Sequence, residues 1–70
     1  SKFLLSPMPG LLISISVVAG QKVKVDDELA VVEAMKMENV LRAEKDQIVK
    51  SVEVKEKDSL VVDQIIIEFE

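Results

Sequence analysis

The sequence of 70 residues contains no cysteine, histidine, tryptophan or tyrosine. Without cysteine, the chain cannot form a disulfide framework or a thiolate metal site. Without histidine, it lacks the usual general base near neutral pH and the most common metal ligand. A Ser-His-Asp or Cys-His catalytic group cannot form from these residues. We therefore expect a domain with no catalytic and no metal-binding residues, which is not an enzyme on its own.

Long apolar runs and a basic surface are also absent. No run approaches the roughly 20 apolar residues of a membrane-spanning helix, and the formal net charge is −4 with both signs interspersed. Nucleic-acid binding requires a basic face, so we expect neither a nucleic-acid partner nor a membrane span. The first ten residues, SKFLLSPMPG, lack the segments of a signal peptide. We expect a C-terminal fragment of a larger chain.

The residues that are present are mainly aliphatic. The sequence is 49% hydrophobic but only 3% aromatic, so we expect a core of Val, Ile and Leu with Phe3 and Phe69 as its largest side chains. β-Branched residues favour strands. Short apolar runs between Gly, Pro, Asp and Ser clusters predict one all-β domain over residues 1–70. The expected strands are 2–5, 11–17, 22–24, 28–34, 38–43, 48–54, 60–61 and 64–69.

An internal repeat relates the two halves of the chain at an offset of 37 positions. Residues 10–33 align with residues 47–70, and their apolar positions match. The repeat predicts two equivalent four-strand units around a pseudo-twofold axis. This symmetry places residues 34–37 at one pole and both termini, including Ser1, at the opposite pole.

The apolar alternation is interrupted at the same place in both halves. Leu12 and Ile15 are three positions apart, as are Val49 and Val52. A β-bulge at each place would keep these side chains on one face. Bent strands suit two sheets that form a flattened barrel or sandwich.

Three polar or proline-containing segments are interpreted as turns. SPMPG (6–10) is a rigid corner or, alternatively, a docking surface, since neither proline can donate to a sheet. VDD (25–27) aligns with VDQ in the repeat, which favours a turn over an acidic or metal site. The charged residues 53–58 fit a solvated strand end and loop.

The segment VVEAMKMENV (31–40) places a lysine between two methionines where the chain is expected to turn. Two-residue hairpin turns usually need positive φ and therefore Asn-Gly or a similar pair, which Met35-Lys36 does not provide. A broken local rule is typical of functional sites. The residues alone leave two interpretations open: a functional amine at Lys36, or an ordinary surface lysine between partly packed methionines.

EAMKM (33–37) resembles the biotin-attachment motif of the biotinyl domain family, the carboxyl carriers of biotin-dependent carboxylases. SPMPG, AGQKV (19–23) and AEKDQIVKSVEV (43–54) resemble other parts of these domains, so the resemblance covers nearly the whole chain. It implies a flattened β-barrel of two four-stranded antiparallel sheets with quasi-twofold symmetry, a barrel-sandwich hybrid.

The resemblance implies that a biotin protein ligase attaches biotin covalently to Lys36. The cofactor then carries a carboxyl group from a biotin carboxylase domain or subunit to a carboxyltransferase domain or subunit. The expected recognition residues around Lys36 are Glu33, Ala34, Met35, Met37 and Glu38. The implied compartment is the cytoplasm for a bacterial protein and the mitochondrial matrix for a eukaryotic one.

Some positions depart from the family pattern. The family often has glycine, which tolerates positive φ, at the expected turn positions Asp26, Gln47, Lys57 and Asp63. Residues 11–23 contain no inserted thumb loop, so the chain resembles carriers of propionyl-CoA-type acyl-CoA carboxylases most. Alternatives are carriers of pyruvate or acetyl-CoA carboxylase or of a biotin-dependent decarboxylase, a lipoyl domain, and an unmodified barrel-sandwich interaction module.

Overall fold

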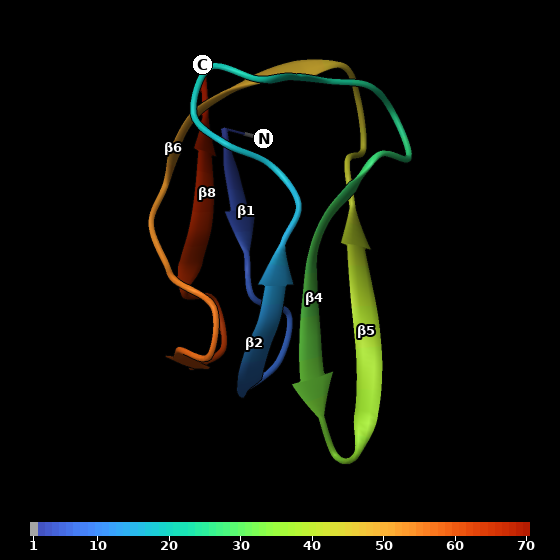
Figure 1. Cartoon of the computed structure of the whole chain (residues 1–70), viewed down its shortest axis with the longest axis vertical. Helices are drawn as coiled ribbons and strands as arrows, with labels where there is room; N and C mark the ends of the chain where they lie inside the picture. Colours follow the sequence, from blue (N-terminus) through green and yellow to red (C-terminus); the bar gives the residue numbers. More distant parts are fainter. Residues whose placement is uncertain (1) are drawn as a thin grey trace.

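The computed structural model describes residues 2–70 and shows eight short strands joined by turns (Figure 1). They are β1 (Phe3–Leu5), β2 (Gly10–Ile15), β3 (Lys22–Val23), β4 (Glu28–Ala34), β5 (Met37–Arg42), β6 (Gln47–Val52), β7 (Ser59–Leu60) and β8 (Ile65–Phe69). All eight expected strands are present, and most boundaries differ from the expectation by one or two residues. Within residues 2–70 there is no helix long and apolar enough to cross a membrane.

The strands form two four-stranded sheets in which every neighbouring pair is antiparallel. One sheet has the order β1-β8-β6-β3 and the other has the order β5-β4-β2-β7. The molecule is elongated, with principal extents of 30 × 20 × 18 Å. This arrangement confirms the predicted flattened barrel of two sheets.

The predicted pseudo-twofold symmetry is visible in the strand order itself. Advancing β1, β2, β3 and β4 by 37 positions gives β5, β6, β7 and β8, and it converts one sheet order into the other. The β-bulges also match. Register shifts occur between Leu12 and Ser14 in β2 and between Val49 and Ser51 in β6, as the broken alternation predicts.

The turns follow the same symmetry. Gly20 and its mate Lys57 both have positive φ, at 89° and 74°, and Asp26 and its mate Asp63 have φ of 72° and 65°. Three of the four family-glycine positions therefore need positive φ, as expected. The expectation is wrong for Gln47, which begins β6 and is not among the residues with positive φ. Its mate is Gly10, the first residue of β2.

The core lies between the two sheets and is aliphatic. Residues buried to at least nine-tenths include Leu12, Val23, Leu29, Val32, Val49, Leu60, Ile66, Ile67 and Phe69. The prediction that Phe3 belongs to this core is wrong: its side chain is 39% exposed. Phe3 starts the edge strand β1, and its neighbour Leu4 is the residue that packs against the core.

The segment 6–10 forms the predicted corner between β1 and β2. Ser6 is fully buried and its hydroxyl donates a hydrogen bond of 2.6 Å to the Met8 carbonyl. The 24–27 turn is closed by the Asp27 carboxylate, which accepts from the Lys24 backbone N–H at 2.9 Å. The described residues hold no group of three or more acidic side chains suited to a metal ion. The Asp27 backbone N–H also donates to the Lys24 carbonyl at 3.0 Å, so residues 24–27 form a turn, as predicted.

The long axis of the molecule separates two poles. In Figure 1 the β4–β5 connection lies at one end, while the start of β1 and the C-terminus lie at the other. This agrees with the placement that the repeat predicts for residues 34–37 and the C-terminus. The other residue in that prediction, Ser1, lies outside the described residues.

Candidate functional site

The candidate site is the hairpin that joins β4 to β5. The two strands pair from Glu28↔Arg42 down to Glu33↔Glu38 and Ala34↔Met37, which leaves only Met35 and Lys36 to make the turn. β4 is a central strand of its sheet, held by β2 on its other side. After a register shift between Glu28 and Ala30, the β4–β5 ladder is regular up to its last pair at the hairpin.

The backbone of this turn is in the left-handed region. Met35 has φ of 53° and Lys36 has φ of 64°, and positive φ at both central residues is the mark of a type I′ turn. Each non-glycine residue in this region costs roughly 1–2 kcal/mol. The sequence predicts the hairpin correctly, but its residues are ones that normally avoid this turn. The turn is therefore strained, and the side chains of Met35 and Lys36 do not relieve this strain.

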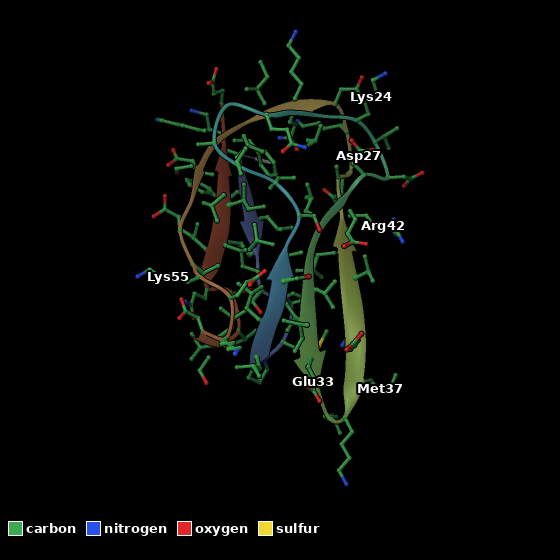
Figure 2. The ribbon with its side chains drawn as sticks, viewed as in Figure 1. Lys24, Asp27, Glu33, Met37, Arg42 and Lys55 are labelled. Atoms are coloured by element: carbon green, nitrogen blue, oxygen red, sulfur yellow. The ribbon has the colours of Figure 1, made fainter. Side chains whose placement is uncertain are left out.

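The side chains at the turn point into solvent. Met35 is 94% exposed and Met37 65% exposed, the first being the most exposed large hydrophobic residue described in the chain. Lys36 and Glu38 are also exposed, whereas Glu33 and Ala34 are half-buried. Figure 2 shows Glu33 and Met37 at the end of the hairpin, far from Lys24 and Asp27. All six residues expected from the sequence are therefore gathered at one pole.

Like charges face each other just behind the tip. Glu33 and Glu38 are directly opposite in the β4–β5 ladder, an arrangement that destabilises an antiparallel pair. Near the other end of the ladder Glu28 lies opposite Arg42, a favourable pair. The tip therefore combines unfavourable charge placement with unfavourable turn residues, which is evidence that it was not selected for stability alone.

Gly10 is a supporting residue that the sequence did not single out for this role. A Cβ atom there would lie 2.5 Å from the Glu33 carbonyl oxygen and 2.9 Å from a Val32 methyl group. Only glycine lets β2 approach β4 this closely beside the tip. The signal in the sequence was the glycine that ends SPMPG, which was interpreted as part of a corner. Gly10 fixes the base of the hairpin.

Two grooves in the surface lie away from the tip. One of them, about 380 Å³, lies between β1 and β5 and is lined mainly by apolar residues such as Phe3, Leu5 and Leu41, together with Arg42. None of residues 33–38 lines it. A small molecule could be held at the hairpin by a covalent bond, for which the exposed primary amine of Lys36 is chemically suited. The residues present thus fit a tethered group and not an enclosed one.

Comparison with known proteins gives a consistent result. The sequence model of a family described as biotin-requiring enzymes, which covers biotin and lipoyl domains, matches residues 2–69. The chain is 50% identical over 70 residues to the propionyl-CoA carboxylase alpha chain of Ruegeria pomeroyi, covering 100% of this chain and 10% of that protein. It is 43% identical over 65 residues to human mitochondrial pyruvate carboxylase, covering 93% of this chain and 6% of that protein.

The fold also recurs in a domain of another kind. The lipoyl domain of the 2-oxoglutarate dehydrogenase complex from Azotobacter vinelandii superposes with a TM-score of 0.80 at 20% identity, covering 100% of this chain and 89% of that one. At this identity the likeness concerns the fold alone. Fold therefore does not separate biotin carriers from lipoyl carriers, and the residues of the tip must do so.

Proposed function

We propose that this chain, which belongs to the family of biotin-requiring enzymes, is a carrier domain whose biotin is attached to Lys36. Both sequence relatives described above are carboxylases, and the chain spans only about a tenth of the propionyl-CoA carboxylase alpha chain. We infer that residues 1–70 are one domain of a larger biotin-dependent carboxylase. The domain itself is not catalytic.

The observation that carries this proposal is the placement of Lys36. It occupies the second position of a two-residue turn with φ of 64°, at the pole opposite the C-terminus. A left-handed backbone at Met35 and Lys36 projects both side chains beyond the end of the β4–β5 ladder. The amine is thus presented on a two-residue turn of a paired hairpin, which forms one end of the molecule along its long axis (Figure 1). Such an amine can enter a deep active site of a partner protein.

In the attachment reaction this chain contributes only the nucleophilic amine. The Lys36 Nζ attacks an activated carboxyl carbon of biotin; an amide forms, and the activating group leaves with the bonding electrons. A lysine ammonium must first lose a proton, and the sequence offers no histidine or cysteine to accept it. The ligase therefore supplies the base. The ring of bound biotin supplies the chemistry of accepting and releasing a carboxyl group.

The neighbouring residues have distinct roles in recognition. Met35 and Met37 offer soft, adaptable apolar contacts, and their exposures of 94% and 65% leave them free for a partner. Ala34 is small, so a partner can approach the ladder closely. Glu33 and Glu38 add two carboxylates that repel each other. A positively charged partner surface would offset this repulsion. We assign these five residues to contacts with the ligase and with the carboxylase and carboxyltransferase domains.

The start of β1 lies at the pole opposite the β4–β5 hairpin, which supports a tethered carrier. A covalent linker makes each encounter of the carrier with a partner domain intramolecular, with effective concentrations of order mM for short flexible linkers. A link at the pole opposite Lys36 leaves the tip unobstructed. The 50% identity to the Ruegeria pomeroyi propionyl-CoA carboxylase alpha chain over all 70 residues supports an acyl-CoA carboxylase as the parent enzyme.

The proposal is tested by ligase treatment of three proteins: the wild type, Lys36→Arg and Lys45→Arg. Lys45 is an exposed lysine in the β5–β6 connection and serves as the matched control. We expect biotin protein ligase, with ATP and biotin, to label the wild type and Lys45→Arg but not Lys36→Arg, as read by streptavidin binding. Labelled Lys36→Arg of native fold would overturn the assignment. A lipoyl ligase in parallel should label none of them.

A further inference from the structure

We propose that Met35 is a site of reversible oxidation by peroxide and that the oxidised hairpin is a poor substrate for the biotin ligase. The second part rests on the proposed function; the first does not. The proposed apolar contact of Met35 with a partner does not require that its sulfur can be oxidised. The proposal concerns a modification site on Met35 itself, adjacent to Lys36 but chemically separate from it.

The three methionines of the chain differ sharply in access to solvent. Met35 is 94% exposed and Met37 65% exposed, whereas Met8 is half-buried in the 6–10 corner, where its carbonyl accepts a hydrogen bond from Ser6. A thioether is oxidised when a peroxide can reach the sulfur from outside. The turn provides this access, because Met35 lies beyond the last pair of the β4–β5 ladder, Ala34↔Met37, and is almost fully exposed. The expected order of reaction is therefore Met35, Met37, then Met8.

The chemistry is a two-electron transfer to a hydroperoxide. A lone pair of the Met35 sulfur attacks one peroxide oxygen, an S–O bond forms and the O–O bond breaks. The sulfur is oxidised and the peroxide is reduced to water, with the proton of the transferred hydroxyl group going to the leaving hydroxide. The product is a polar, chiral sulfoxide, which methionine sulfoxide reductases convert back, one enzyme for each epimer.

The effect should be confined to recognition. Met35 lies outside the two sheets and contributes no side chain to the core, so its oxidation leaves the fold intact. In an interface, by contrast, an apolar contact would become a polar group that needs a new hydrogen-bond partner. An unsatisfied group of this kind weakens binding by about tenfold or more. Peroxide would thus lower the rate at which new carriers receive biotin.

The site itself is tested without any ligase. The unmodified chain is treated with hydrogen peroxide for increasing times, and each methionine is followed by peptide mass spectrometry. We expect Met35 sulfoxide to form first and Met8 sulfoxide last, with an unchanged melting temperature. Oxidation of Met8 as fast as Met35, or a lower melting temperature once only Met35 has reacted, would refute the assignment.

The consequence is tested by comparing each protein with its own untreated sample. Peroxide should slow biotinylation of the wild type and of Met8→Leu about tenfold or more, and the two sulfoxide reductases together should restore it. The Met35→Leu/Met37→Leu variant should keep its own untreated rate. Equal rates before and after oxidation of the wild type would overturn the proposal. An untreated wild type that takes no biotin would instead refute the proposed function, since the oxidation order is measured separately.

Discussion

Replacing Met35 by asparagine should stabilise the domain by about 1 kcal/mol. Met35 has φ of 53°, where a non-glycine residue costs roughly 1–2 kcal/mol. Asparagine is among the residues that type I′ turns prefer, because its short polar side chain tolerates this conformation. For a domain of this size, 1 kcal/mol corresponds to a rise in melting temperature of about 4–8 °C. Thermal and urea unfolding, followed by circular dichroism, measure both quantities.

Met37→Asn is the matched control for this substitution. Met37 is also an exposed methionine, two residues away, but it begins the extended strand β5. Asparagine is unfavourable in strands, so the same replacement should leave the stability unchanged or lower it. A Met35→Asn variant that melts at or below the wild-type temperature would refute the claim that this turn is strained. Ligase treatment should show slower biotinylation of the more stable variant, since a recognition contact is lost.

Three further predictions use the symmetry and packing of the fold. Lys57→Gly removes the side chain from a residue with φ of 74° and should raise the free energy of unfolding by up to about 1 kcal/mol. Gly20→Ala, at the symmetry mate with φ of 89°, should lower the free energy of unfolding by about as much. Equilibrium unfolding in urea measures both changes. Gly10→Ala would place a Cβ 2.5 Å from a β4 carbonyl oxygen and should lower the free energy of unfolding by roughly 1–3 kcal/mol. Gln47→Ala, at the symmetry mate of Gly10, should lower it by less. Equal decreases for the two variants would contradict the claim that Gly10 is required for the close approach of β2 to β4. Leu12→Ala, at a fully buried position, should cost roughly 2–5 kcal/mol, and a thermal melt that shifts by only a degree or two would show that the core is misassigned.

The strands and their symmetry could be predicted because the sequence contains them twice. Each half shows the same apolar positions and the same break in alternation, and both breaks became β-bulges at equivalent places, after Leu12 and after Val49. Such a pattern is governed by the two-residue period of a strand, which local sequence alone reveals. The position of the tip opposite the C-terminus followed from the same offset.

The errors have physical causes that alternation does not reveal. Period-two alternation shows which residues share a face, but not which face is covered, and Phe3 therefore looked like a core residue although it lies outward on the edge strand β1. Gln47 was expected at a turn because relatives often have glycine there. Its mate Gly10 shows another reason for glycine at such a position, namely the close approach of a neighbouring strand.

The geometry of the tip was beyond the reach of sequence rules. Met35 and Lys36 are not residues that predict a type I′ turn, yet both have positive φ. The hairpin is imposed by the strands around it, because β4 and β5 pair up to Ala34↔Met37 and leave two residues to reverse the chain. Tertiary structure overrode local preference at the very residues expected to have a function.

The central claim, that Lys36 is the single attachment site of biotin, is tested most directly by mapping the modified residue. The chain is treated with biotin protein ligase, digested, and sequenced by tandem mass spectrometry. We expect one biotinyl group per chain, located on Lys36 in the peptide that contains AMKM. Biotin on another lysine of the folded chain, or an intact mass that shows no addition, would contradict the account.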